Sequence, residues 1–219
     1  MTPIDRVKAS VYDIRKGTPL PDALFCDTNI LYWVFYPSFG TLQLAGGATP
    51  SVNQAKEYPK WIKWVMKSGK NLCVCNGTIA EIVKTMEYAE LETLWVTDPS
   101  HSSNDRFDAR RFKSARYQYL NMLESVRKRI CTHLASLRKH VRVMADPRSP
   151  ETAVDTYLVD WSVCAGDFPD SVAVSIAKQH GIPQIVTDDQ DFLTMEGVIV
   201  YTANVQAIAD ATRAGKMLN

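Results

Sequence analysis

Five acidic residues that could bind a divalent cation stand near the ends of apolar or helical stretches, although they are far apart in the sequence. They are Asp27, Glu81, Asp170, Asp189 and Asp191. If these carboxylates converge in the fold, their mutual repulsion requires a bound positive charge. Oxygen ligands without accompanying Cys or His favour Mg²⁺ or Mn²⁺ over zinc. Such a site activates a water for in-line attack on a phosphodiester.

Each acid also has a purely structural interpretation. Thr78 and Glu81 match a capping box, in which the glutamate accepts a hydrogen bond from a backbone amide. Asp167 is placed to cap a helix, with Asp170 favoured in its first turn by the helix dipole. Capping does not explain why acids stand at nearly every predicted carboxyl edge with so few bases beside them.

The elements that must position these acids alternate between strands and helices. Apolar runs at 23–27, 72–75, 182–187 and 198–201 predict strands. Apolar residues at helical spacing predict helices over 78–95 and 169–180. This alternation predicts an α/β fold of three layers, α/β/α, around a central and mainly parallel sheet. Such sheets bind ligands beyond the carboxyl ends of their strands.

Charge is unevenly distributed along the chain. The 219 residues contain 25 Lys and Arg against 24 Asp and Glu, a formal charge of +1. Residues 104–142 alone carry +8, and the remainder therefore carries −7. Apolar residues recur every three or four positions through the basic stretch, which predicts one long helix or a helical hairpin. They are Phe112, Ala115, Tyr119, Met122, Val126, Ile130, Leu134, Leu137 and Val141.

We expect residues 1–219 to form a single domain, in which 98–150 is a basic helical insertion and 1–22 an N-terminal extension. Five cysteines without C-x-x-C spacing argue against a disulfide framework and a zinc site. They suit the reducing cytoplasm, and no signal peptide is visible. No run reaches the roughly eighteen apolar residues of a membrane helix, so we expect no membrane partner.

Four short segments resemble the motifs of PIN-domain ribonucleases, a group that includes toxins of bacterial toxin–antitoxin pairs. Residues 25–30 (FCDTNI) resemble the opening D-T-N motif, and Glu81 the lone helical acid. Residues 170–177 resemble the helix that carries the third acid, and 185–192 (IVTDDQDF) the closing T-x-D-x-D-F motif. Each motif is weak alone, but their order and their settings agree.

The resemblance implies a role for each matching position. Asp27, Glu81, Asp170 and Asp189 would be the catalytic acids that ligate Mg²⁺ or Mn²⁺, with Asp191 as a further ligand. Thr28 and Thr187 would support the ligands through their hydroxyls, and Asn29 would position the loop or the substrate. Asp167 is kept as a helix cap close to the site.

The resulting hypothesis is a metal-dependent endonuclease, in which a metal-activated water leaves 5′-phosphate and 3′-hydroxyl ends. RNA is favoured over DNA as substrate, although this route does not use the ribose 2′-hydroxyl. The basic stretch would bind the phosphate backbone, and its alternative is a solvated helix face. The cations concerned are Arg106, Arg110, Arg111, Lys113, Arg116, Arg127, Lys128 and Arg129. The resemblance also admits an inhibitor (antitoxin) protein and a second copy of the chain as partners.

Two other functions remain open. A phosphatase of the haloacid-dehalogenase type places a second Asp two residues after the first, but that position is Asn29. A non-catalytic module would keep the fold and bind nucleic acid, or be held by an inhibitor. The complete set of acids argues against lost catalysis.

Overall fold

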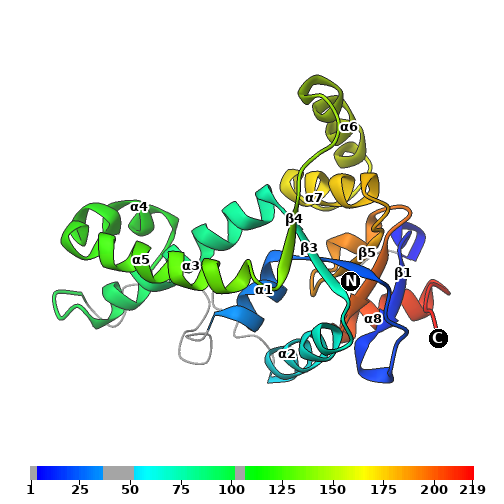
Figure 1. The fold of residues 1–219 in the computed structure, drawn as a ribbon, viewed down its shortest axis with the longest axis horizontal. Helices are drawn as coiled ribbons and strands as arrows, with labels where there is room; N and C mark the ends of the chain where they lie inside the picture. Colours follow the sequence, from blue (N-terminus) through cyan, green and yellow to red (C-terminus); the bar gives the residue numbers. More distant parts are fainter. Residues whose placement is uncertain (1–3, 37–51, 102–106) are drawn as a thin grey trace.

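The computed structural model describes residues 4–36, 52–101 and 107–219. Its centre is a six-stranded sheet in which every strand pair is parallel, in the order β1-β6-β5-β2-β3-β4 (Figure 1). The strands are β1 (Ser10–Asp13), β2 (Ala23–Cys26), β3 (Asn71–Cys75), β4 (Val141–Met144), β5 (Gln184–Val186) and β6 (Ile199–Thr202).

Helices cover both faces of this sheet, so the predicted three-layer α/β/α fold is confirmed. The helices are α1 (Thr28–Phe35), α2 (Val52–Lys67), α3 (Asn76–Thr97), α4 (Ala109–Gln118), α5 (Leu120–Leu137), α6 (Pro150–Ser162), α7 (Phe168–Gln179) and α8 (Val205–Arg213). Short 3₁₀ helices are η1 (Ile4–Arg6), η2 (Ile14–Lys16) and η4 (Asp191–Thr194). No helix of the described residues is both long and apolar enough to cross a membrane.

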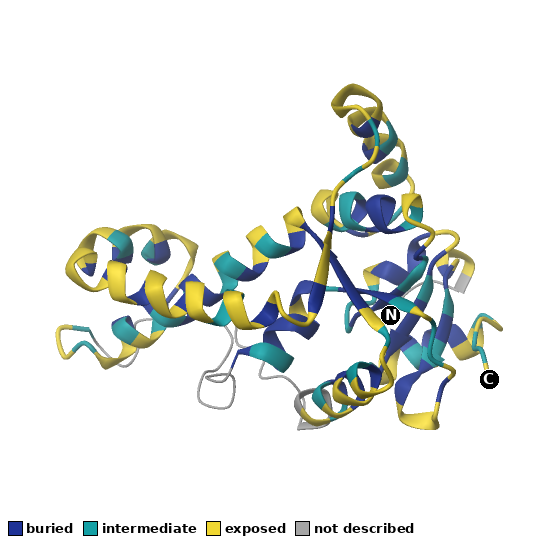
Figure 2. Cartoon of the chain, in the orientation of Figure 1, coloured by how far each residue is buried: buried dark blue, intermediate teal, exposed yellow. Residues whose placement is uncertain are grey.

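The two cores follow from the alternation of side chains along the strands. In β3, Leu72 and Val74 belong to the core on the face covered by α2 and α3, whereas Cys73 and Cys75 belong to the core on the opposite face, where α7 contacts β3. A strand buried on both faces has no polar side, which is why 72–75 is a continuous apolar run. In Figure 2 the central strands are mostly buried, the edge strand β4 is partly exposed, and the outer faces of the helices are exposed.

The order of the strands marks where a ligand would bind. From β2 the chain moves outward through β3 to β4, then returns to the other side of β2 to form β5 and β6. The order therefore reverses between β2 and β5, which pair at Phe25–Ile185 and Cys26–Val186. Ligand sites of open α/β sheets lie beyond the carboxyl ends of the strands at this reversal.

Residues 1–22, predicted as an extension, contribute a strand to the sheet. β1 pairs with β6 from Ser10–Ile199 to Asp13–Thr202, and Val11 is fully buried. Two of the four residues of β1, Ser10 and Asp13, are polar, so the strand gives no continuous apolar run.

The range 98–150 is likewise not wholly a helical insertion. α5 ends at Leu137, and Val141 begins β4, so the predicted helical stripe is wrong at this last position. β4 pairs with β3 from Leu72–Val141 to Cys75–Met144, and this pairing buries Val141. The helical part of the basic stretch is α4 and α5, so the hairpin alternative is the closer one.

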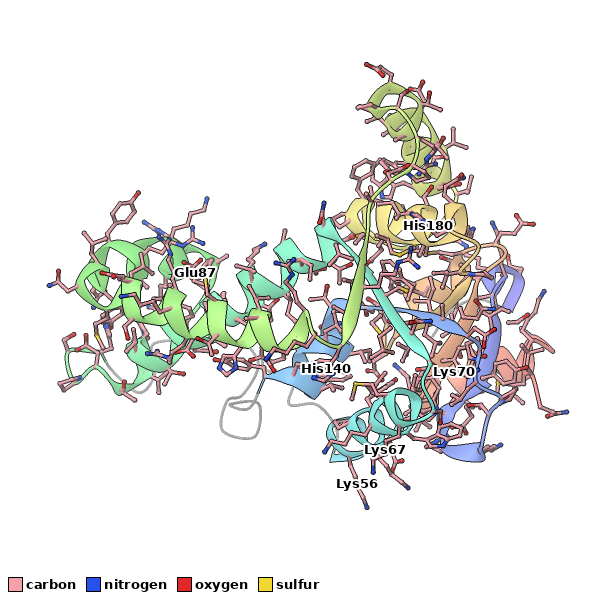
Figure 3. All side chains as sticks on the ribbon, in the orientation of Figure 1. Lys56, Lys67, Lys70, Glu87, His140 and His180 are labelled. Carbon is pink, nitrogen blue, oxygen red and sulfur yellow. The ribbon has the colours of Figure 1, made fainter. Side chains whose placement is uncertain are left out.

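α4, α5 and the outer half of α3 form an arm that projects from the sheet (Figure 1). The arm has its own apolar core, separate from the two cores of the sheet. Its buried members are Leu91, Trp95, Phe107, Phe112, Ala115, Tyr119 and Leu123. Glu87, also buried, lies inside the arm (Figure 3), where it forms ion pairs with Arg116 and Arg127.

Leu91→Ala should destabilise the arm, because Leu91 is fully buried in its core. We expect a loss of about 2–5 kcal/mol in the free energy of unfolding, measured by urea denaturation. Leu120→Ala is the control, since Leu120 is 63% exposed at the start of α5 and should change the free energy by less than about 0.5 kcal/mol. Equal losses for the two variants would contradict a packed arm core.

Candidate functional site

Asp27 links the two strands at the reversal of strand order. It follows β2 and caps α1, with its Oδ1 accepting a hydrogen bond from the Thr28 amide at 2.6 Å. Its Oδ2 accepts a hydrogen bond from the hydroxyl of Thr187, which follows β5, at 2.7 Å. Its own amide donates to the carbonyl of Val186 at 3.1 Å. Asp27 thus caps α1 and keeps its carboxylate at the carboxyl edge of the sheet.

Glu81 faces Asp27 from the neighbouring helix. α3 begins at Asn76 and is capped at Cys75 without a side-chain hydrogen bond, so the predicted capping box of Thr78 and Glu81 is wrong. Glu81 lies in the second turn, where its Oε2 accepts a hydrogen bond from the Thr28 hydroxyl at 2.6 Å. Its carboxylate is thereby turned toward the end of β2.

Asp170 enters from α7, whose N-terminus points to the same edge of the sheet. Asp167 caps this helix and accepts a hydrogen bond from the Asp170 amide at 3.0 Å, which confirms its predicted role as a cap. Asp170 lines a cavity of about 20 Å³ together with Asp27 and Glu81. That volume accommodates little more than one water or one ion.

The segment after β5 lies beside this cavity and is folded around Thr187. The Thr187 hydroxyl donates to Asp27 and accepts a hydrogen bond from the Asp189 amide at 2.9 Å. Asp189 Oδ1 in turn accepts from the Asp191 amide at 2.9 Å. Asp189 and Asp191 do not line the cavity, and Asp191 is exposed. Asn29 is also exposed, in the first turn of α1.

The electrostatics of the site show that the acids are close enough to oppose one another's ionisation. Burial raises the pKa of Asp27 to about 7, and the charges of Glu81 and Asp189 add to the rise against the hydrogen bonds that lower it. Burial also raises the pKa of Asp170 to about 8, with further contributions from Asp27, Asp167, Asp189 and Glu81. The pKa of Asp191, although this residue is exposed, is raised by partial desolvation and then by the charges of Asp189 and Asp167.

The chemistry of these donors fits a hard divalent cation. The described residues that line the cavity supply carboxylate and hydroxyl oxygens and include neither Cys nor His. Within the described ranges, however, no three acidic, His or Cys side chains already stand in a metal-binding arrangement. The Thr28 and Thr187 hydroxyls occupy one oxygen each of Glu81 and Asp27. Each carboxylate keeps further lone pairs that a cation could use, and a bound cation would have to draw the acids closer together.

Tyr58 supports the segment after β5 and was not predicted. This residue of α2 is fully buried, and its hydroxyl lies 2.7 Å from Asp188 Oδ1, 2.9 Å from Thr202 Oγ1 and 2.9 Å from the Ala203 amide. Burial raises the pKa of Tyr58, so the hydroxyl stays protonated and donates to Asp188. α2 thus holds Asp188, the residue before Asp189, through the Tyr58 hydroxyl.

Most cations predicted to bind phosphate prove to have protein partners. Arg116 and Arg127 pair with Glu87, Arg129 pairs with Glu90, and Lys128 pairs with Glu124. Arg111 lies over the ring of Trp95 at 5.4 Å. Arg110 and Lys113 are exposed on α4, and Arg106 falls outside the described residues.

Comparison of the chain with models of protein families, with curated proteins and with solved structures gives no match. Its function must therefore be inferred from its residues and their geometry.

The metal-free protein should lose stability as the pH rises from about 4 to about 8. In that range the folded state binds more protons than the unfolded state, because folding raises the pKa values of Asp27 and Asp170 from 3.8 to about 7 and about 8. Asp170→Asn, which is neutral at every pH, should therefore raise the melting temperature by a few degrees at about pH 8 and leave it nearly unchanged at about pH 4.

Scanning calorimetry in EDTA measures this effect. Asp155→Asn, which removes an exposed acid of α6, should leave the pH dependence as in the wild type. A melting temperature of Asp170→Asn below that of the wild type at high pH would show that the acids do not oppose one another.

Tyr58→Phe should loosen the segment after β5. The variant leaves Asp188 and the Ala203 amide without the hydroxyl, which should cost about 1–3 kcal/mol in the free energy of unfolding. Amide hydrogen exchange should become faster at Asp189 and Asp191. Tyr117→Phe, at an exposed phenol on α4, is the matched control. Unchanged exchange after β5 in Tyr58→Phe would refute this role.

Proposed function

We propose that this chain is a metal-dependent nuclease of the PIN type that hydrolyses phosphodiester bonds, with RNA as the favoured substrate. The observation that supports the proposal most is the convergence of Asp27, Glu81 and Asp170 on one cavity, with Asp189 beside it. These acids come from four different elements, and the cavity lies where ligands bind in open α/β sheets. The motif resemblance assigns the same four residues.

In this proposal Asp27, Glu81, Asp170 and Asp189 hold Mg²⁺ or Mn²⁺, and Asp191 assists. The cation supplies a water of lowered pKa and positive charge opposite the phosphate. The chain's own residues orient the ligands, since the Thr187 hydroxyl fixes one oxygen of Asp27 and the Thr28 hydroxyl fixes one of Glu81. Asp167 holds the start of α7 and thereby the position of Asp170.

The proposed setting is the cytoplasm, where the thiols of the chain would stay reduced. All five cysteines are free, and Cys26, Cys73 and Cys75 are buried in the cores on either side of the sheet. An inhibitor protein that reaches the same acids would do so with a basic side chain, because only positive charge relieves their repulsion.

Cleavage of labelled single-stranded RNA in Mn²⁺ and in EDTA tests the proposal. We expect cleavage in Mn²⁺ only, and a loss of at least about 100-fold in rate for Asp27→Asn. Asparagine caps a helix as well as aspartate does, so the variant should keep α1 and its fold. Asp155→Asn should cleave like the wild type.

A second measurement reports on the cation itself. Mn²⁺ should raise the melting temperature of the wild type and of Asp155→Asn by mass action, and not that of Asp27→Asn. Cleavage by Asp27→Asn at the wild-type rate would place the activity elsewhere or in a contaminant.

A further inference from the structure

Four lysines form a continuous stripe along the outer face of α2. Lys56, Lys60, Lys63 and Lys67 are spaced four, three and four residues apart, which places them on one face of a helix. All four are exposed, and Figure 3 shows Lys56 and Lys67 extending away from the body of the protein. The stripe is about 16 Å long at 1.5 Å of rise per residue.

The stripe lies opposite the face of α2 that belongs to the core. Tyr58, Trp61, Ile62 and Val65 are buried there, so the helix is fixed and its lysines face solvent. Within the described residues, none of the four lysines forms an ion pair with a carboxylate, unlike Lys70, which pairs with Asp22 at 2.7 Å. Like charges at this spacing destabilise a helix, so an anion that lies along the stripe would be favoured.

Trp64 adds an aromatic surface beside the lysines. It is 43% exposed and follows Lys60 by four residues, whereas Trp61 in the same helix is 5% exposed. A single strand of nucleic acid offers a regular series of phosphates and unstacked bases, and proteins bind it with cations and aromatic rings together. In a duplex the base faces are covered, so Trp64 would have nothing to stack on.

The position of the stripe connects it with the candidate site. Tyr58, two residues after Lys56, contacts Asp188 at the carboxyl end of β5. The stripe therefore begins beside the edge of the sheet that carries the acids and runs away from it. An acidic site repels phosphates, so a substrate strand needs a separate basic surface that leads to it.

We propose that the lysine stripe of α2, with Trp64, is a binding track for single-stranded nucleic acid. The lysines contact successive phosphates and Trp64 stacks on a base. This proposal rests on the proposed nuclease function, and it adds that the nuclease binds its substrate as a single strand. An anionic membrane is the rival occupant, but the apolar face of α2 is buried and cannot insert into lipid.

Fluorescence anisotropy with a labelled oligouridine tests the track, in EDTA so that binding is measured without cleavage. Lys60→Ala/Lys63→Ala should weaken binding and reduce the slope of log affinity against log salt by about 1.4, which is about 0.7 for each phosphate that is no longer neutralised. Trp64→Ala should weaken binding about 5-fold or more without changing the slope, and Trp64→Phe should restore most of it. Circular dichroism checks that each variant is folded.

Lys139→Ala/Lys216→Ala is the matched control, because it removes two exposed positive charges outside the stripe. Its affinity and salt slope should stay close to those of the wild type. The arm supplies the competing surface, so Arg110→Ala/Lys113→Ala is measured alongside. If the arm variant loses binding and the Lys60→Ala/Lys63→Ala variant does not, the track on α2 is overturned.

Three further results would also overturn it: no binding of oligouridine by the wild type, equal affinity for a duplex of the same length, or binding to phosphatidylserine vesicles in its place. In Mn²⁺, Lys60→Ala/Lys63→Ala should raise KM and leave kcat unchanged. Intact binding without any cleavage would refute the nuclease function and keep the track. Cleavage that the lysine variants do not affect would refute the track alone.

Discussion

The concentration of negative charge where β2 and β5 end is the constraint on which the rest of this structure depends. Parallel pairing of these strands brings Asp27 and the segment from Thr187 to Asp189 together, and α3 and α7 add Glu81 and Asp170. The groups that reach Asp27 and Glu81 are hydroxyls and an amide, which orient the carboxylates without neutralising them. Folding therefore raises the pKa values of Asp27 and Asp170, and the sheet and its two cores must stabilise the fold against that cost. In the proposed function, a bound cation would relieve this repulsion.

Much of the sheet is readable from the sequence because a strand buried on both faces is a continuous apolar run. The runs at 23–27, 72–75 and 198–201 agree with β2, β3 and β6 to within one or two residues. β1 and β4 have no such run, and both lie at an edge of the sheet. Two of the four residues of β1 are polar, and β4 contains Arg142 and continues the apolar spacing of α5. Val141 matches the helical stripe by position, and only its pairing with Leu72 makes it a strand residue.

Some features of the candidate site could likewise be predicted from the sequence, and others could not. The sequence predicts that Asp27, Glu81 and Asp170 lie at one edge, because ligand sites of parallel sheets lie beyond the carboxyl ends of the strands. That prediction depends only on topology, which the alternation of strands and helices reveals. The capping box failed at Glu81 because its spacing is right but α3 starts two residues before Thr78. Tyr58 could not be found, since the partner of a buried hydroxyl is decided by tertiary packing. Its helix, α2, contains Pro59 and mixes aromatic residues with lysines, so its pattern is weak until the sheet is in place.

The sequence gives the number of cations, but the tertiary structure decides which of them can approach a phosphate. The +8 of residues 104–142 overstates the basic surface of the arm, because Glu87 and Glu90, which pair with three of its arginines, come from α3 outside that range. α2 carries fewer cations, yet its four lysines share one exposed face. Counterion release depends on cations that can approach phosphates, and cations held against carboxylates contribute little to it. α2 contacts the acidic edge of the sheet through Tyr58 and exposes its lysines on the opposite face. The helix therefore fixes the position of the basic stripe relative to the acids and keeps the opposite charges apart.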